Sequence, residues 1–202
     1  MASTSTTTAP IPDRGSGRLL RIGASLLVAF VIVFSAWWIA GREGIDELGN
    51  AGMNASLLPS VGDTAPDFTV YDLSGRQRSL SEFRGQPVWI NFWGSWCPPC
   101  RAEMPDIQSA YEQLQPQGLV ILAISVRESA TDAARFAHLN GATFTILSDP
   151  DQSATGVAYP VFNFPTHIFV NRDGTIASIA LKPLSVAEAI EHGEQIINSP
   201  AA

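Results

Sequence analysis

The two cysteines of the chain, Cys97 and Cys100, stand three residues apart and are the side chains best suited to do chemistry. A thiolate can attack a disulfide, and a second thiol at this spacing can resolve the mixed disulfide that forms. A zinc-binding pair is the alternative, but tetrahedral zinc needs four ligands and the chain has no other cysteine. His138, His167 and His192 occur singly, without the spacing of a ligand set. The pair therefore indicates redox chemistry without a metal ion or an organic cofactor.

The cysteines lie between a predicted buried strand and a predicted helix. Residues 88–93 form an almost continuous apolar run, which is typical of a central strand buried on both faces. Pro98 and Pro99 suit the first turn of a helix, where a missing N–H costs nothing, and apolar residues continue at helical spacing to Leu114. Cys97 should lie at the helix N-terminus, where unpaired N–H groups and the helix dipole favour a thiolate and lower the thiol pKa.

Residues 92–100, with the sequence FWGSWCPPC, resemble the active site of the thioredoxin fold. The continuation to Pro105 resembles the membrane-anchored TlpA/ResA-like thiol-disulfide oxidoreductases, and the likeness extends from about Val61 to Ile197. The resemblance implies that Cys97 is the attacking cysteine and that Cys100 resolves the mixed disulfide.

Glu103 is the third expected catalytic residue. It follows Cys100 by one helical turn and matches the glutamate of the CxxCxxE pattern in ResA-like proteins, where it is held near the cysteine pair. Burial favours the protonated form of a carboxyl group, which suits a group that gives and takes protons. The alternative is an ordinary glutamate on the helix surface, near the favourable end of the helix dipole. Asn91 stands where thioredoxins carry a buried aspartate, so that position is neutral here.

The segment around Pro165 completes the expected site. Phe164 and Pro165 precede a predicted hairpin as the cis-proline segment does in the thioredoxin fold. In the family this segment lies against the cysteine pair and hydrogen-bonds the substrate backbone. The expected substrate-binding residues are Trp96, Pro98, Pro99, Phe164 and Pro165.

The rest of the domain alternates strands with helices, which indicates an α/β fold. We expect a thioredoxin fold with a central mixed β-sheet, helices on both of its faces, an N-terminal β-hairpin, and the strand-helix insertion of TlpA-like proteins. Strands are predicted at 68–73, 77–80, 88–93, 119–126, 144–147, 166–170 and 175–181. Helices are predicted from Cys97 onward, at 131–139 and at 185–197, with one turn at 81–84 and a turn with a short helix at 149–158. Ser185, followed three residues later by Glu188, is expected to cap the last of these helices.

The chain before the domain reads as a membrane anchor. Residues 1–18 are predicted to be a disordered cytoplasmic tail, 19–40 a single transmembrane helix, 41–60 a flexible linker and 61–198 the thioredoxin-like domain. Arginines lie before the apolar run, so the N-terminus should be cytoplasmic and the domain extracytoplasmic. A cleaved signal peptide is the alternative, but its apolar region would be shorter and would end in small residues.

These observations predict a thiol-disulfide oxidoreductase of the cell membrane. By resemblance, it would reduce protein disulfides in cytochrome c maturation or copper-site assembly, with apocytochrome c or a copper-receiving protein as client and a membrane thiol carrier as electron donor. The net charge of −7 argues against a nucleic-acid partner. Alternatives are a copper-binding or copper-delivery module, a disulfide-forming oxidase and a thiol peroxidase. A peroxidase would want threonine or serine three residues before its cysteine, where this chain has Gly94.

Overall fold

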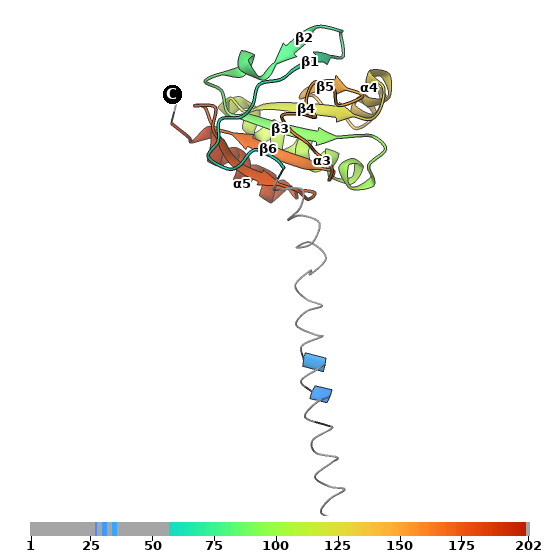
Figure 1. Cartoon of the computed structure of the whole chain (residues 1–202), viewed down its shortest axis with the longest axis vertical. Coiled ribbons are helices and arrows are strands. Elements are labelled where there is room, and N and C mark those ends of the chain that lie inside the picture. Colours follow the sequence, from blue (N-terminus) through green and yellow to red (C-terminus); the bar gives the residue numbers. More distant parts are fainter. Residues whose placement is uncertain (1–26, 28–29, 32–33, 36–56, 201–202) are drawn as a thin grey trace, which may run out of the picture. The chain divides into compact units, whose positions relative to one another are not determined.

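The sheet is organised around β3 (Val88–Trp93), whose six residues are all buried. The computed structural model describes residues 27, 30–31, 34–35 and 57–200 of the chain. Within residues 57–200, β3 pairs in parallel with β4 (Val120–Val126) and antiparallel with β6 (Thr166–Val170). The full strand order is β2-β1-β5-β4-β3-β6-β7, which makes the sheet mixed, as predicted (Figure 1).

The remaining strands extend the sheet on both sides. They are β1 (Thr69–Asp72), β2 (Gln77–Ser79), β5 (Thr145–Asp149) and β7 (Ile176–Ala180). The predicted N-terminal hairpin is β1–β2, and β1 joins the sheet by pairing antiparallel with β5. β6 and β7 form the predicted late hairpin.

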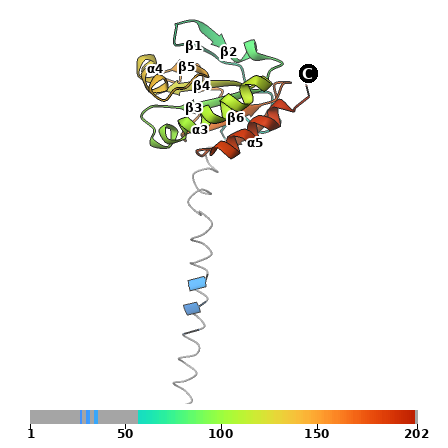
Figure 2. The same cartoon turned by 180° about the vertical axis from the view of Figure 1, so that it is seen from behind.

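The three α-helices of residues 57–200 pack on the same face of the sheet. They are α3 (Pro98–Leu114), α4 (Ala130–Leu139) and α5 (Val186–Ile197), and all contribute to one apolar cluster with Trp89 and Trp93. The steps from β3 to β4 and from β4 to β5 are both parallel and run in the same direction across the sheet. Right-handed crossovers then place α3 and α4 on the same side (Figure 2). The prediction of helices on both faces is wrong for the α-helices.

The opposite face is covered by non-α structure. Its apolar cluster holds the 3₁₀ helix η1 (Leu80–Phe83), Leu58 from the predicted linker, and Tyr159 and Val161. η1 corresponds to the single turn predicted at 81–84, and Leu58 is buried although its neighbour Leu57 is exposed.

The short helix predicted within 149–158 is absent: Asp149 ends β5, and residues 150–158 form turns and a bend. The carboxylate of Asp149 accepts hydrogen bonds from the backbone N–H groups of Ala154 and Thr155 and from the Thr155 hydroxyl. Gln152 has a φ of 56°, in the left-handed region. Because the Asp149 side chain binds these N–H groups and Gln152 is left-handed, the segment does not form the regular backbone hydrogen bonds of a helix.

Helix α5 is fixed at its start and along its buried side. Ser185 caps it in a reciprocal box with Glu188, as the sequence predicts. Gly193 faces α3, and a Cβ atom there would overlap Leu114. The missing side chain therefore permits the close approach of α5 to α3. The short 3₁₀ helix η2 (Gln115–Gln117) follows α3.

In the part of the chain that the structure describes, no helix has the length and apolar character needed to cross a bilayer. The predicted tail 1–18, most of the anchor 19–40 and the linker up to residue 56 lie outside the described residues. Leu27, Phe30, Val31, Phe34 and Ser35 are helical. The membrane anchor therefore stays a prediction.

The cap of α5 generates a prediction about acid stability. The Lys182 ammonium and the Ser185 hydroxyl bind the exposed carboxylate of Glu188 and lower its pKa from 4.5 to about 2. A pKa lowered by folding stabilises the domain above the unfolded value, and this stabilisation is lost as the pH falls through about 2. Glu188→Gln should flatten the decline of the thermal unfolding midpoint over that range. Glu194→Gln on the same helix is the control, and parallel curves for Glu188→Gln and wild type would contradict the assignment.

Candidate active site

The site begins with the disulfide between Cys97 and Cys100, whose Cα atoms are 5.3 Å apart. Cys97 is the N-cap residue of α3, and its Sγ atom accepts a hydrogen bond from the Cys100 backbone N–H at 3.3 Å. The predicted position of Cys97 at a helix N-terminus is confirmed. The Cys100 backbone N–H and the positive end of the α3 dipole therefore lie at the sulfur on which negative charge develops when the disulfide is reduced.

Both cysteines are buried in this disulfide form. Cys97 is 3 % exposed and Cys100 1 %, whereas Trp96 is 43 % exposed and the two intervening prolines are exposed as well. Both cysteines pack into the apolar cluster beneath α3. A client must therefore fit against the exposed residues around the disulfide to reach it.

The lack of a side chain at Gly94 leaves room for the indole of Trp96 in the exposed surface around the disulfide. The Trp96 indole N–H donates to the Val126 carbonyl at the end of β4, at 2.8 Å. A Cβ atom on Gly94 would overlap the same indole. A threonine or serine there, as a thiol peroxidase would want, could be accommodated only if Trp96 moved.

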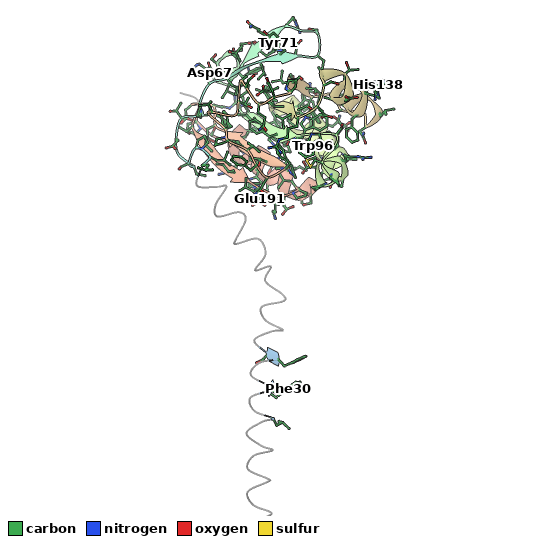
Figure 3. All side chains as sticks on the ribbon, turned by 45° about the vertical axis from the view of Figure 1, so that its right-hand side comes forward. Phe30, Asp67, Tyr71, Trp96, His138 and Glu191 are labelled. Atoms are coloured by element: carbon green, nitrogen blue, oxygen red, sulfur yellow. A yellow bond between two sulfur atoms is a disulfide. The ribbon has the colours of Figure 1, made fainter. Side chains whose placement is uncertain are left out.

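Trp96, Phe164 and Arg127 form a group that we call the aromatic rim (Figure 3 labels Trp96). The rings of Trp96 and Phe164 meet edge to face with their centroids 5.2 Å apart. The Arg127 guanidinium lies over both rings, 5.8 Å from that of Trp96 and 5.0 Å from that of Phe164. The peptide bond between Phe164 and Pro165 is cis, as the resemblance implies. The rim thus joins the cysteine loop to the cis-proline segment.

Arg127 is itself held in an uncommon backbone conformation. Its φ is 60°, its backbone N–H donates to the Pro150 carbonyl at 2.9 Å, and its Nε atom donates to Gln152 Oε1 at 3.0 Å. Left-handed backbone is uncommon for a residue other than glycine and is often found at functional sites. The turn segment after β5 therefore positions the guanidinium over the rim.

Glu128 supports the cysteine loop from the end of β4. Its carboxylate accepts hydrogen bonds from the Ser95 backbone N–H at 2.8 Å, from the Ser95 hydroxyl, and from the Ser125 hydroxyl at 2.6 Å. Charge-assisted hydrogen bonds are roughly twice as strong as neutral ones. Glu128 therefore fixes the residues that lead into the disulfide.

Glu103 is buried behind the disulfide and is 3 % exposed, so the helix-surface alternative is wrong. Its Oε2 atom accepts a hydrogen bond from the Leu184 backbone N–H at 3.1 Å and lies 3.3 Å from His167 Nε2. Its Oε1 atom has no hydrogen-bond partner among the described residues. A buried carboxyl group with one free oxygen, one helical turn beyond Cys100, is placed to exchange a proton with that cysteine.

Arg127, Glu128 and His167 were missed by the sequence interpretation. A signal existed for the first two, because they directly follow a predicted central strand. The carboxyl ends of neighbouring parallel strands meet at one edge of a sheet, so residues after β4 come close to the cysteines after β3. His167 gave no comparable signal, because its partners lie far from it in sequence.

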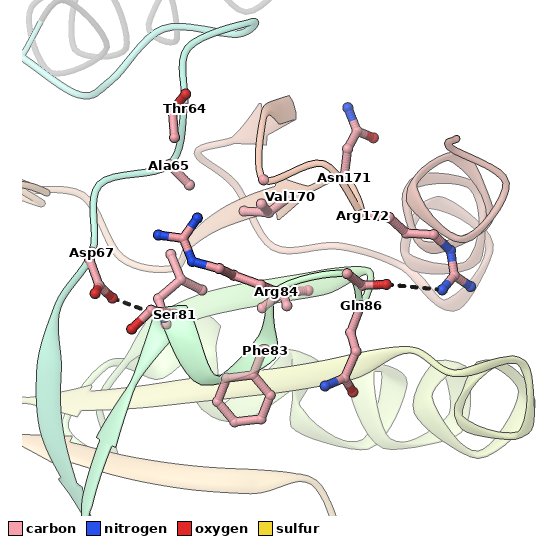
Figure 4. A pocket seen from close by; sticks show the side chains of 14 residues that line it. Thr64, Ala65, Asp67, Ser81, Phe83, Arg84, Gln86, Val170, Asn171 and Arg172 are labelled. Carbon is pink, nitrogen blue, oxygen red and sulfur yellow. Dashed lines mark hydrogen bonds between the residues drawn. The ribbon is translucent and has the colours of Figure 1, made fainter. Parts of the chain in front are cut away.

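Two further observations bear on ligands. Among the residues that the structure describes, no three or more histidine, cysteine, aspartate or glutamate side chains gather where they could hold a metal ion. A cavity lined by Phe83, Arg84, Gln86 and Arg172 lies where β3 begins and β6 ends (Figure 4). The cysteines follow the other end of β3, so this cavity is not part of the site.

Known proteins share this sequence pattern. The model of the AhpC/TSA family matches residues 61–179. The chain belongs to the AhpC/TSA family. It is 38% identical over 137 residues to the thiol-disulfide oxidoreductase ResA of Geobacillus thermodenitrificans, covering 68% of this chain and 78% of that protein. It is 34% identical over 140 residues to ResA of Bacillus subtilis, covering 69% and 70% respectively.

A solved structure agrees with these relatives. A secreted thiol-disulfide isomerase from Corynebacterium glutamicum superposes with a TM-score of 0.61 at 29% identity, covering 67% of this chain and 86% of that one. The predicted thioredoxin-like fold and the resemblance to ResA-like proteins are confirmed. The chain is a thiol-disulfide oxidoreductase, and Cys97 and Cys100 are its redox pair.

The role of Glu128 can be tested by its removal. Glu128→Ala leaves the Ser95 N–H and both serine hydroxyls without their charged acceptor, which should cost about 1.5–3 kcal/mol of unfolding free energy. It should also slow disulfide exchange, because the loop before Cys97 loses its support. Chemical denaturation and insulin reduction measure the two effects, with exposed Glu194→Ala as the control for a lost charge. Wild-type stability and rate in Glu128→Ala would contradict this role.

Proposed function

We propose that this protein is a membrane-tethered, extracytoplasmic reductant of protein disulfides with a narrow range of clients. The observation that supports a narrow range of clients is that Cys97 and Cys100 are both buried beside an exposed surface formed by Trp96, Pro98 and Pro99. A small thiol or an unrelated protein would make few contacts with this surface and would therefore bind it weakly. A client that docks on the rim and on the cis-proline segment brings its own sulfur to Cys97.

The reduced protein acts through Cys97, Cys100 and Glu103. The Cys97 thiolate attacks one sulfur of the client disulfide, the client S–S bond breaks, and its electron pair leaves on the second client sulfur. Cys100 then gives its proton to Glu103 and attacks Cys97, which releases the first client sulfur as a thiolate. Glu103 passes the proton to one client thiolate, and the other takes a proton from water. Two electrons have moved to the client, and the pair is again a disulfide.

The direction and the compartment are supported by the predicted anchor and by the ResA-like resemblance. An extracytoplasmic compartment is oxidising, so a cysteine pair that must accept haem or copper needs a local reductant. A domain tethered to the membrane could be re-reduced by a membrane thiol carrier. The clients we propose are the cysteine pairs of apocytochrome c or of a copper-receiving protein.

The division of roles predicts that Cys97 is the reactive thiol of the reduced protein. Because Cys97 caps α3, its pKa should lie well below the value of about 8.5 for a free cysteine. The alkylation rate measured against pH in Cys100→Ser should report that pKa, and Cys97→Ser should react far more slowly at neutral pH. Faster alkylation of Cys100 than of Cys97 would reverse the assignment.

The direction can be tested by the reduction potential and by the phenotype of a deletion. Equilibration with glutathione or dithiothreitol should give a potential nearer to about −270 mV, as in thioredoxin, than to about −120 mV, as in a strong oxidant. Deleting the gene, or Cys97→Ala, should lower c-type cytochrome or copper-oxidase content, and an added thiol reductant should restore it. An oxidising potential, or normal cytochromes with a general loss of disulfides in secreted proteins, would refute the reductant assignment.

A further inference from the structure

We infer that His167 is a positioning residue for Glu103, and that the indole of Trp89 fixes the protonation state in which it acts. The inference rests on the proposed role of Glu103 in proton exchange. His167 is fully buried on β6, and Trp89 on neighbouring β3 is buried as well. Neither residue touches a client in the proposed reaction, so both act through the carboxyl group.

The tautomer of His167 follows from its contact with Trp89. The indole Nε1 atom always carries a hydrogen and can only donate. It lies 3.2 Å from His167 Nδ1, within a buried hydrogen bond, so Nδ1 must accept and can carry no proton. A neutral imidazole then has its only proton on Nε2. His167 is thereby held as a neutral ring whose single N–H is at Nε2.

That N–H faces the carboxyl group of Glu103. Nε2 lies 3.3 Å from Glu103 Oε2 and has no hydrogen-bond partner among the described residues. This contact does not meet the geometry of a hydrogen bond, so the N–H acts mainly as a nearby dipole whose positive end stabilises charge on the carboxylate. Because it is buried, this dipole is screened much less than it would be in water.

The two oxygens of Glu103 consequently have different surroundings. Oε2 accepts a hydrogen bond from the Leu184 N–H at 3.1 Å and lies close to His167 Nε2, whereas Oε1 has no hydrogen-bond partner in the described part of the chain. Donors at one oxygen stabilise negative charge there and leave the other free for a proton. Oε1 is therefore the atom that takes and releases the proton, and His167 and Leu184 hold the carboxyl group in that orientation.

The other titratable groups near His167 and Glu103 provide no alternative hydrogen-bond donor to the Glu103 carboxyl group among the described residues. Cys97 and Cys100 precede Glu103 on α3, and Asn91 is the register partner of His167 on β3 and is uncharged. On α5, His192 stacks on Phe169, with ring centroids 4.6 Å apart, and Phe169 lies next to His167 at 6.5 Å.

His192 has charged neighbours of its own, namely Lys182, Glu188 and Glu191. Burial is the main cause that lowers the pKa of His192, and a charged His167 would lower it further.

The first test reads the tautomer directly. Ring-nitrogen NMR of the full chain, labelled at histidine, should show His167 neutral with its proton on Nε2 at neutral pH. In Trp89→Phe, which removes the indole N–H, the Nδ1–H form or the imidazolium should become populated. An Nδ1–H tautomer or an imidazolium in the wild type, or an unchanged tautomer in Trp89→Phe, would overturn the inference.

The second test measures how His167 affects the pH dependence of cysteine alkylation. The paired variants are His167→Gln, whose side-chain amide keeps an N–H donor near the Nε2 position, and His167→Asn, which keeps only a group near Nδ1. The pH profile of thiol alkylation should move by about one pH unit in His167→Asn and stay near wild type in His167→Gln. A ring that served only packing would not distinguish the two amides. Equal shifts in both variants, or none in His167→Asn, would contradict the positioning role.

Glu103→Gln separates this inference from the proposed function. If Glu103→Gln moves the alkylation profile and His167→Asn does not, the proton role of Glu103 holds and the role of His167 fails. If Glu103→Gln leaves the profile unchanged, the proposed proton exchange fails, whatever tautomer the NMR spectra show. Denaturation curves of each variant confirm that the readouts come from folded protein.

Discussion

A carboxyl group buried one helical turn beyond the redox disulfide is the constraint on which the rest of the structure depends. An isolated buried charge is costly, so Glu103 needs donors that hold it without exposing it to water. The Leu184 N–H and His167 Nε2 meet one of its oxygens. These partners come from the loop before α5 and from β6, and Trp89 on β3 fixes the histidine in turn. The carboxyl group is therefore held by segments that only the completed fold brings together.

The same topology explains the outer surface of the site. The cysteines follow β3 and Arg127 follows β4, so the parallel pairing of these strands brings both to one edge of the sheet. The antiparallel β6 starts at that edge, immediately after the cis bond before Pro165. One end of the sheet thus gathers the buried redox pair, the aromatic rim and the cis-proline segment, while α3, α4 and α5 cover a single face behind them.

Local signals in the sequence predicted the parts of the structure that local physics decides. An almost continuous apolar run predicted β3, two prolines predicted the first turn of α3, and Ser185 with Glu188 predicted the start of α5. The resemblance supplied the cis peptide bond before Pro165 and the position of Glu103.

Tertiary contacts decided what the sequence could not predict. The turns after β5 depend on how the Asp149 carboxylate binds the backbone that follows it. The placement of α3 and α4 on one face depends on the direction of successive crossovers. His167 could be dismissed as an isolated histidine in the sequence because Trp89 and Glu103 are 78 and 64 residues away from it.

The central claim is that Glu103 exchanges a proton with the cysteine pair as the pair changes redox state. Proton uptake per disulfide reduced, followed with an indicator dye at a series of pH values, measures this exchange directly. The account predicts that wild type and Glu103→Gln take up different numbers of protons over part of the pH range in which the thiols titrate. Superimposable uptake curves for the two proteins would contradict it.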